Sequence, residues 1–182
     1  MNRTFLSIIF VFAFSFAAEA QDWAWKTFSP PSGEWSINAP GTLSPDEEAQ
    51  EAKSKMGSYS YSDFYGFFAV VYRDSKANFW SLRPDYSDYY KKIRNDFIKA
   101  SKGQLIKEEK YTFDDRVGRD VRIKVPAGTM TGLEGKTITK YRIERIRMFF
   151  VDKRLFLLLA VLPEDIIDTP AVNKFFDSFT AK

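Results

Sequence analysis

Apolar and polar residues alternate along several short stretches of the chain, which is the pattern of β-strands with one buried face. Trp35, Ile37 and Ala39, for example, alternate with polar neighbours. Residues 64–72 and 155–162 are almost wholly apolar, which is typical of strands buried on both faces. The other predicted strands are 25–28, 58–62, 104–113, 117–125 and 137–151.

The long strand predicted at 137–151 changes phase part-way along. Ile143 occupies an odd position, whereas Ile146 and Phe150 occupy even positions, so in a regular strand they would point to opposite faces. One extra residue at Glu144–Arg145, forming a β-bulge, would place both apolar sets on the same face of the sheet. The sequence therefore predicts a bulge at this point.

Two segments carry apolar residues at the spacing of three to four that marks an amphipathic helix. The first is predicted over 86–102, with Asp85 as its N-cap and Gly103 as the left-handed residue that ends it. The second begins at Thr169–Pro170, where Thr is a capping residue and Pro suits the first helical turn. Its apolar face is Val172, Phe175, Phe176 and Phe179.

The predicted order is strands, helix, strands, helix, and short links join most of the strands. Short links favour antiparallel pairing, because parallel neighbours need a long crossover. We therefore expect one α+β domain within 21–182, built on a single mainly antiparallel sheet flanked by helices, with its ordered part at about 23–180.

The first twenty residues have the pattern of a secretory signal peptide. Arg3 is followed by an apolar run over 5–18, and small residues precede a cut after Ala20. The apolar run is too short to span a bilayer, which needs roughly 20 residues. The sequence predicts cleavage at this point and an extracytoplasmic protein, periplasmic or secreted, without a later transmembrane segment.

Composition narrows the chemistry available to the protein. The chain of 182 residues has no Cys and no His, which excludes disulfides, thiolate nucleophiles, imidazole catalysis and Cys- or His-ligated zinc. The formal net charge is only +3, below the concentrated charge of a dedicated nucleic-acid binder. We expect no metal site, no cofactor and no nucleic-acid partner.

Several short motifs occur in an order that resembles the PsbP-like group of small domains. They are Trp25-x-x-Phe28, Gly33-x-Trp35-x-Ile37-x-x-Pro40, Gly118–Asp120, Arg154–Leu158 and Lys174–Phe179. The resemblance covers nearly the whole chain after the signal peptide and implies an α/β/α sandwich. Members include an extrinsic subunit of the oxygen-evolving complex, a Ran-binding import factor and DcrB-like lipoproteins, so the fold implies no single function. This chain lacks the Cys of the lipoprotein members, and no catalytic residue transfers to it.

Basic residues cluster on two of the predicted strands. The cluster is Arg122, Lys124, Lys140, Arg142, Arg145 and Arg147. A hairpin closed in the Gly-rich loop 126–135 places Arg122 opposite Lys140 and Asp120 opposite Arg142. This row of cations is a partner-binding patch for an acidic protein or anionic lipid surface, a solvated face, or a face that covers a helix with its aliphatic stems.

Aromatic residues gather around the link before the first helix. They are Phe79, Trp80, Tyr86, Tyr89 and Tyr90. Tyr and Trp rings in loops stack on sugars or anchor protein partners, whereas rings in a helical stripe pack on a sheet. The sequence is compatible both with a ligand-binding or partner-binding role and with packing on the sheet.

No motif or residue constellation indicates a catalytic site. Asp114–Asp115 is a pair of carboxylates, but adjacent residues in a turn are normally solvated. We therefore expect a monomeric, non-enzymatic accessory or protein-binding domain whose partner is a protein or acidic surface outside the cytoplasm. The alternatives are a small-ligand or carbohydrate-binding module that uses the aromatic link around Trp80 and, third, an uncharacterised hydrolase.

Overall fold

The computed structural model describes residues 23–46, 56–74, 86–131 and 137–182. The signal peptide predicted over 1–20 lies outside these ranges and stays a prediction. The ligand-binding role of Phe79 and Trp80 also stays a prediction, because both residues lie outside these ranges, as does Asp85. No helix in the described part of the chain is long and apolar enough to cross a membrane.

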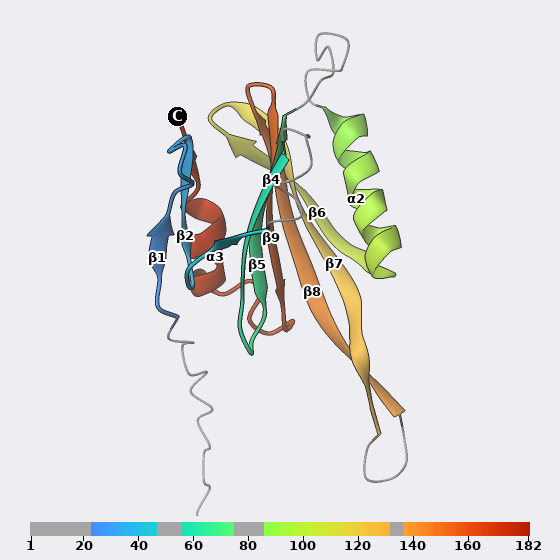
Figure 1. Cartoon of the computed structure of the whole chain (residues 1–182). Coiled ribbons are helices and arrows are strands. Elements are labelled where there is room, and N and C mark those ends of the chain that lie inside the picture. The colour runs from blue at the N-terminus through green and yellow to red at the C-terminus, as the bar shows by residue number, and fades with distance from the viewer. Residues whose placement is uncertain (1–22, 47–55, 75–85, 132–136) are drawn as a thin grey trace, which may run out of the picture.

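A seven-stranded antiparallel sheet forms the centre of the molecule, and a three-stranded sheet packs beside it (Figure 1). The large sheet has the order β3 (Ser44–Pro45), β4 (Met56–Ser62), β5 (Phe67–Asp74), β9 (Arg154–Leu162), β8 (Thr137–Val151), β7 (Arg116–Thr131) and β6 (Gln104–Phe113). The small sheet has the order β1 (Lys26–Phe28), β2 (Trp35–Ala39) and β10 (Thr180–Ala181). The α+β fold with a mainly antiparallel sheet is confirmed.

Helix α2 (Ser87–Ser101) covers one face of the large sheet, and helix α3 (Pro170–Asp177) with the small sheet covers the other (Figure 1). Two apolar cores result. The core under α2 includes Tyr90, Ile123, Ile146 and Phe150, all 2% exposed or less. The core under α3 and the small sheet is larger and richer in aromatic rings, with Trp35 against Phe179 at 6.0 Å between centroids.

Helix α3 begins as the sequence predicts. The Thr169 hydroxyl accepts a hydrogen bond from the backbone N–H of Val172, and Pro170 stands in the first turn. Val172, Phe175 and Phe176 are fully buried. Because these side chains fill the space between the sheet and β2, the helix is part of the core rather than a surface appendage.

The ends of α2 differ in detail from the prediction. Tyr86 is its N-cap, and Lys102, not Gly103, adopts the left-handed conformation at its end, with φ 51°. Gly103 is needed for a different reason: a Cβ there would lie 2.4 Å from Cγ2 of Ile123. The helix end therefore packs against β7 too closely for any side chain at this position.

The bulge predicted at Glu144–Arg145 is absent, and that prediction is wrong. β8 keeps an unbroken register with β9 from Ile143 to Val151. Side chains on both sides of β8 are buried, because α2 covers one side of the strand and α3 covers the other. The irregularity lies in β7 instead, between Pro126 and Thr129.

The bounds predicted for the Gly-rich loop, 126–135, are also wrong. β7 continues as a strand to Thr131, and Gly128, with φ 117°, belongs to the bulge. β5 likewise begins at Phe67 rather than Phe64, because a turn occupies 63–66. The turn at Asp114–Asp115 is confirmed, with φ of 43° and 64°.

Candidate functional site

The register of the β7–β8 hairpin decides where the predicted cation cluster goes. Arg122 pairs with Arg145 and Asp120 pairs with Arg147, not with Lys140 and Arg142 as expected. The register differs because β7 runs past the Gly-rich segment and the hairpin closes further along the chain. Two arginines therefore lie directly opposite each other, an arrangement that requires nearby negative charge.

The expectation of six cations on one exposed face is wrong. Arg122, Arg145 and Arg147 are 7%, 4% and 6% exposed, beneath α3. Side chains alternate along a strand, so Lys140 and Arg142 share the parity of Ile146 and face the α2 side. The cluster is thus divided between two faces, and half of it is inaccessible to a partner.

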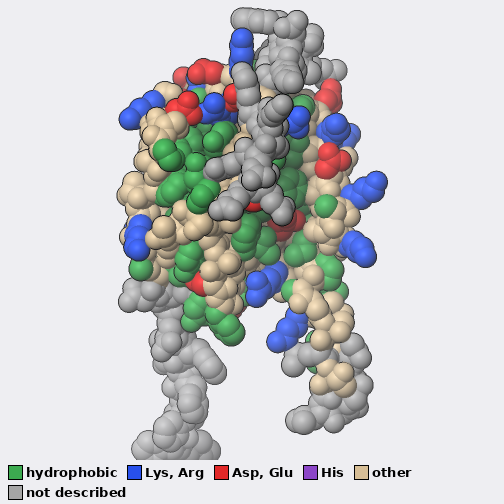
Figure 2. Space-filling model, in the orientation of Figure 1, with side chains coloured by type: hydrophobic (Ala, Val, Ile, Leu, Met, Phe, Trp, Pro, Cys, Tyr) green, Lys and Arg blue, Asp and Glu red, His purple; other side chains and the backbone are tan. Residues whose placement is uncertain are grey.

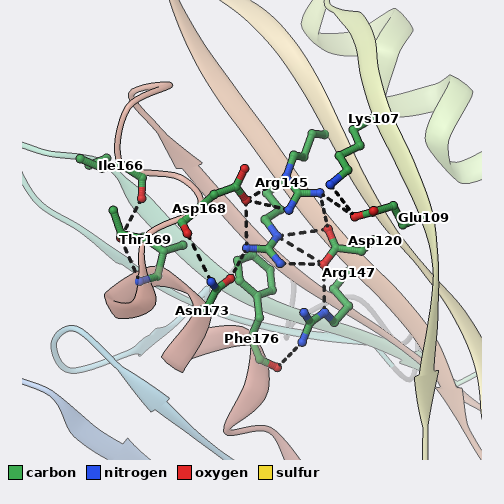
Figure 3. Close-up of polar contacts among 12 residues, drawn as sticks. Lys107, Glu109, Asp120, Arg145, Arg147, Ile166, Asp168, Thr169, Asn173 and Phe176 are labelled. Carbon is green, nitrogen blue, oxygen red and sulfur yellow. Dashed lines mark hydrogen bonds and ion pairs between the residues drawn. The ribbon is translucent and has the colours of Figure 1, made fainter.

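The buried arginines surround one carboxylate, that of Asp120 (Figure 3). Arg145 donates to it through Nη2 at 2.9 Å and Nε at 3.1 Å, and Arg147 donates through Nε at 3.1 Å. Nη1 of Arg122 lies 3.6 Å from the same carboxylate. Asp120 is therefore the centre of an ionic cluster, which we call the Asp120 cluster.

Groups from α3 and its preceding link complete the Asp120 cluster from the outside (Figure 3). Asp168 accepts from Arg122 at 2.7 Å, and Asn173 accepts from Arg145 at 2.7 Å. Arg147 donates to the backbone carbonyl of Phe176 at 2.9 Å and to Asp177 at 2.7 Å. These contacts bind the last helix to β7 and β8.

Charge in the Asp120 cluster is compensated. Three guanidinium groups face four carboxylates, those of Asp120, Asp168, Asp177 and Glu109. Burial alone would raise the pKa of Asp120, but hydrogen bonds and charges of Arg145, Arg147 and Arg122 outweigh burial and lower it. The carboxylate is thus ionised and surrounded by donors, which suits neither a general base nor a metal ligand.

Glu144, on the α2 side of the neighbouring strand β8, is the opposite case. It is 8% exposed, and its Oε2 has no hydrogen-bond partner. Burial raises the pKa of this carboxyl, and the side chain of Ser101 only partly offsets the effect. Asp120 and Glu144 are therefore both buried, and neither is an accessible carboxylate.

The aromatic residues before and within α2 that the structure describes pack inward. Tyr90 is fully buried and donates its hydroxyl to the backbone carbonyl of Val117 at 2.9 Å. Tyr86 and Tyr89 contact the ring of Phe150, at 4.7 and 5.6 Å between centroids. The hypothesis that Tyr90 is a ligand-binding ring is wrong, because the stripe belongs to the core under α2.

A cavity of about 340 Å³ lies where the small sheet meets the β8–β9 turn. Arg154 on its wall donates to both Asp74 and Glu34, each at 2.5 Å. These two carboxylates neutralise Arg154 and raise its pKa. Sequence reasoning missed this residue as a link between the two sheets, since its partners lie 80 and 120 positions away.

A row of exposed lysines lies on the outer surface of α2. Lys91, Lys99 and Lys102 are exposed, and with Asn95 they follow one another at the spacing of adjacent helical turns. None of the three forms an ion pair within the described residues. Figure 2 shows Lys and Arg side chains along the side where α2 lies. We call these four residues the α2 basic stripe.

The described part of the chain contains no group of three or more Asp or Glu side chains arranged to hold a metal ion. Lys124, the remaining member of the predicted cluster, is half-buried and bound to Glu164 at 3.0 Å.

No protein-family model matches the chain, and no curated protein matches it. The solved structure of cyanobacterial PsbP (CyanoP) from Synechocystis sp. PCC 6803 matches with a TM-score of 0.61 at 14% identity, covering 90% of this chain and 96% of that one. The Ran-binding protein Mog1p of Saccharomyces cerevisiae matches with a TM-score of 0.49 at 11% identity, over 86% and 95% of the two chains. The match to CyanoP shows that this chain has the PsbP-like fold that its motifs imply.

Proposed function

We propose that the protein is an exported, non-enzymatic accessory domain that binds a protein partner through an acidic surface on that partner. The α2 basic stripe carries the proposal. Its lysines are exposed and form no ion pair with the described residues, whereas the buried arginines of the Asp120 cluster form ion pairs and hydrogen bonds inside the protein. Fixed cations on a rigid helix attract acidic partners at long range.

The chemistry of α2 favours a protein over a membrane as the acidic partner. The apolar side of the helix is buried on the sheet, where Tyr90 is fully covered. A helix that lies in a lipid surface must insert its apolar side, which α2 cannot do without leaving the sheet. Asp88 and Asp96 also interrupt the positive charge of the outer surface, which suits a patterned protein surface better than a uniformly anionic one.

Binding of poly-L-glutamate to the full mature chain tests the charge of the stripe. The variant Lys91→Glu/Lys99→Glu should weaken binding about tenfold or more, since two favourable charges become repulsive. The control Lys26→Glu/Lys153→Glu changes net charge equally but lies elsewhere, and should weaken binding less than threefold. Equal loss in both variants, or stronger capture by phosphatidylglycerol vesicles than by poly-L-glutamate, would contradict the proposal.

Export is tested separately. Mass spectrometry of protein from the extracytoplasmic fraction should find Gln21 as the first residue, because the small residues before it favour cleavage after Ala20. An intact Met1 on material recovered from the cell would refute this part.

A further inference from the structure

The turn between β4 and β5 presents an exposed pair of aromatic rings. Phe64 is 90% exposed, the highest value among the large apolar side chains described, and Tyr65 is 48% exposed. The two rings contact each other edge to face, with 5.6 Å between centroids. The pair thus forms one continuous apolar projection rather than two scattered side chains.

The carboxylate of Asp63 holds this turn in one conformation. Oδ1 accepts from the backbone N–H groups of Tyr65 at 2.9 Å and Gly66 at 3.0 Å. Oδ2 accepts from Nε1 of Trp23 at 3.1 Å and the hydroxyl of Tyr61 at 3.2 Å. Four donors fix one side chain, so the backbone that carries Phe64 is rigid.

The base of the turn is also fixed to the core. A Cβ on Gly66 would lie 2.3 Å from Cδ2 of Leu162 and 2.5 Å from the carbonyl of Val161, so the turn is seated directly on β9. Trp23, which donates to Asp63, packs on Phe68 with 5.3 Å between ring centroids. The same turn that is anchored on its inner side directs Phe64 into solvent.

We propose that Phe64 and Tyr65 form a preorganised anchor that inserts into an apolar pocket on a protein partner. Rigid aromatic side chains are frequent binding hot spots, because they bury a large area and lose little conformational freedom on binding. The inference rests on the proposed function in requiring a protein partner, but it assigns a contact separate from the α2 basic stripe. The Tyr65 hydroxyl has no partner among the described residues and would meet a polar group at the rim of the pocket.

Charge near the turn argues against a lipid surface as the occupant. The segment 62–66 carries one charge, that of Asp63, and it is negative. Glu164 and Asp165, both exposed, follow shortly after Leu162, against which the turn packs. Loops that enter membranes combine aromatic rings with Lys or Arg, whereas acidic neighbours suit a protein pocket with a neutral or basic rim.

Site-specific photocrosslinking tests the anchor in the full chain. p-Benzoylphenylalanine replaces Phe64 in the producing cells, and the product formed on irradiation is identified by mass spectrometry. The partner is then purified and its affinity measured. Phe64→Ser should weaken it about 30-fold or more, the scale of a hot-spot residue, whereas Phe64→Leu should weaken it less than about fivefold. Ile138→Ser, at another exposed apolar position (54%), is the control and should change nothing.

Each other outcome overturns the anchor. A crosslink to lipid, to a second copy of this chain or to nothing excludes a protein pocket, and unchanged affinity of Phe64→Ser excludes a hot spot. The same crosslinker at Asn95 separates the two proposals. A partner captured there but not at position 64 refutes the anchor alone, while capture at neither position refutes protein binding as well.

Discussion

The two faces of the large sheet are closed in different ways. Under α2, the sheet presents an apolar surface on which the rings of Tyr86 and Tyr90 pack around Phe150. Under α3, part of the interface is the Asp120 cluster, in which Arg145 also lies over the ring of Phe176 at 4.4 Å. One face is held mainly by apolar burial, although Tyr90 and Arg94 of α2 also make polar contacts with the sheet. The other face is held partly by the ionic contacts of the Asp120 cluster. A row of cations on a strand therefore indicates a binding surface only when no neighbouring carboxylates neutralise its charges.

Removing the carboxylate of Asp120 is the strongest test of the difference between the two faces. Asp120→Ala should lower the free energy of unfolding by about 3–5 kcal/mol, because it leaves buried arginines without their counter-charge. Denaturant unfolding measures this loss. Glu164→Ala is the control, since Glu164 forms an ion pair with Lys124 at 62% side-chain exposure, and it should cost less than about 1 kcal/mol. A loss below about 1 kcal/mol for Asp120→Ala would mean that the cluster does not stabilise the α3 side.

On the other face, the equivalent test removes a ring. Phe150 is 2% exposed and contacts three tyrosines of α2 and its N-cap. Phe150→Ala should cost about 3–4 kcal/mol through lost burial and the cavity that remains. Hydrogen exchange should show the loss of protection concentrated in α2, with α3 less affected. Equal loss of protection in both helices would show that the two faces unfold as one unit.

Acid should act on the two faces with opposite signs. The folded pKa of Asp120 lies below its ordinary value of 3.8, so its stabilising contribution is present above that value and is lost as pH falls through the folded pKa. The folded pKa of Glu144 lies above its ordinary value of 4.5, so its contribution is full below that value and is lost as pH rises through the folded pKa.

Two amide variants measure these opposite effects. Glu144→Gln should raise the free energy of unfolding at pH 7 by up to about 1 kcal/mol, because no charge is then buried, and the gain should vanish below pH 4.5. Asp120→Asn should lower it at pH 7, and its difference from wild type should narrow in acid. Denaturant unfolding from pH 3 to 8 gives both profiles, and parallel profiles would refute the opposition.

The smallest effect is expected at the α2 basic stripe. Lys91→Ala and Lys99→Ala should each change the free energy of unfolding by less than about 0.5 kcal/mol, because both side chains are exposed and form no ion pair with the described residues. Thermal or denaturant unfolding checks this. A loss above about 1 kcal/mol would show that these lysines stabilise the fold and would remove the contrast with the buried arginines.

Local patterns in the sequence were sufficient to predict most of the helices and strands. The alternation around Trp35 and the cap at Thr169–Pro170 predicted β2 and the start of α3, because both signals depend on near neighbours in the chain. The bulge assigned to Glu144–Arg145 was wrong for a related reason. Alternation reports which side chains are buried, but it assumes one covered face, and the chain does not show locally that α2 and α3 cover both.

The candidate site depended on long-range contacts that no local pattern contains. Arg122 and Lys140 were expected to face each other, but the bulge at Pro126 and the later closure of the hairpin changed the register. A small shift of register changes every cross-strand partner. The contacts of Asp168 and Asp177 with the buried arginines, across 46 and 30 positions, were likewise beyond local prediction.

By itself, the sequence determined the fold class, the PsbP-like order of motifs, the exclusion of thiol and imidazole chemistry, and the prediction of export. Those conclusions follow from composition and short-range periodicity, which the chain carries at each position. Tertiary structure alone decided which charges are compensated and which aromatic rings are buried. Tyr90 and Phe64 are both aromatic residues beside a turn or helix end, yet one is fully buried and the other 90% exposed. The difference arises because burial depends on what the rest of the chain packs against a side chain, not on the side chain itself.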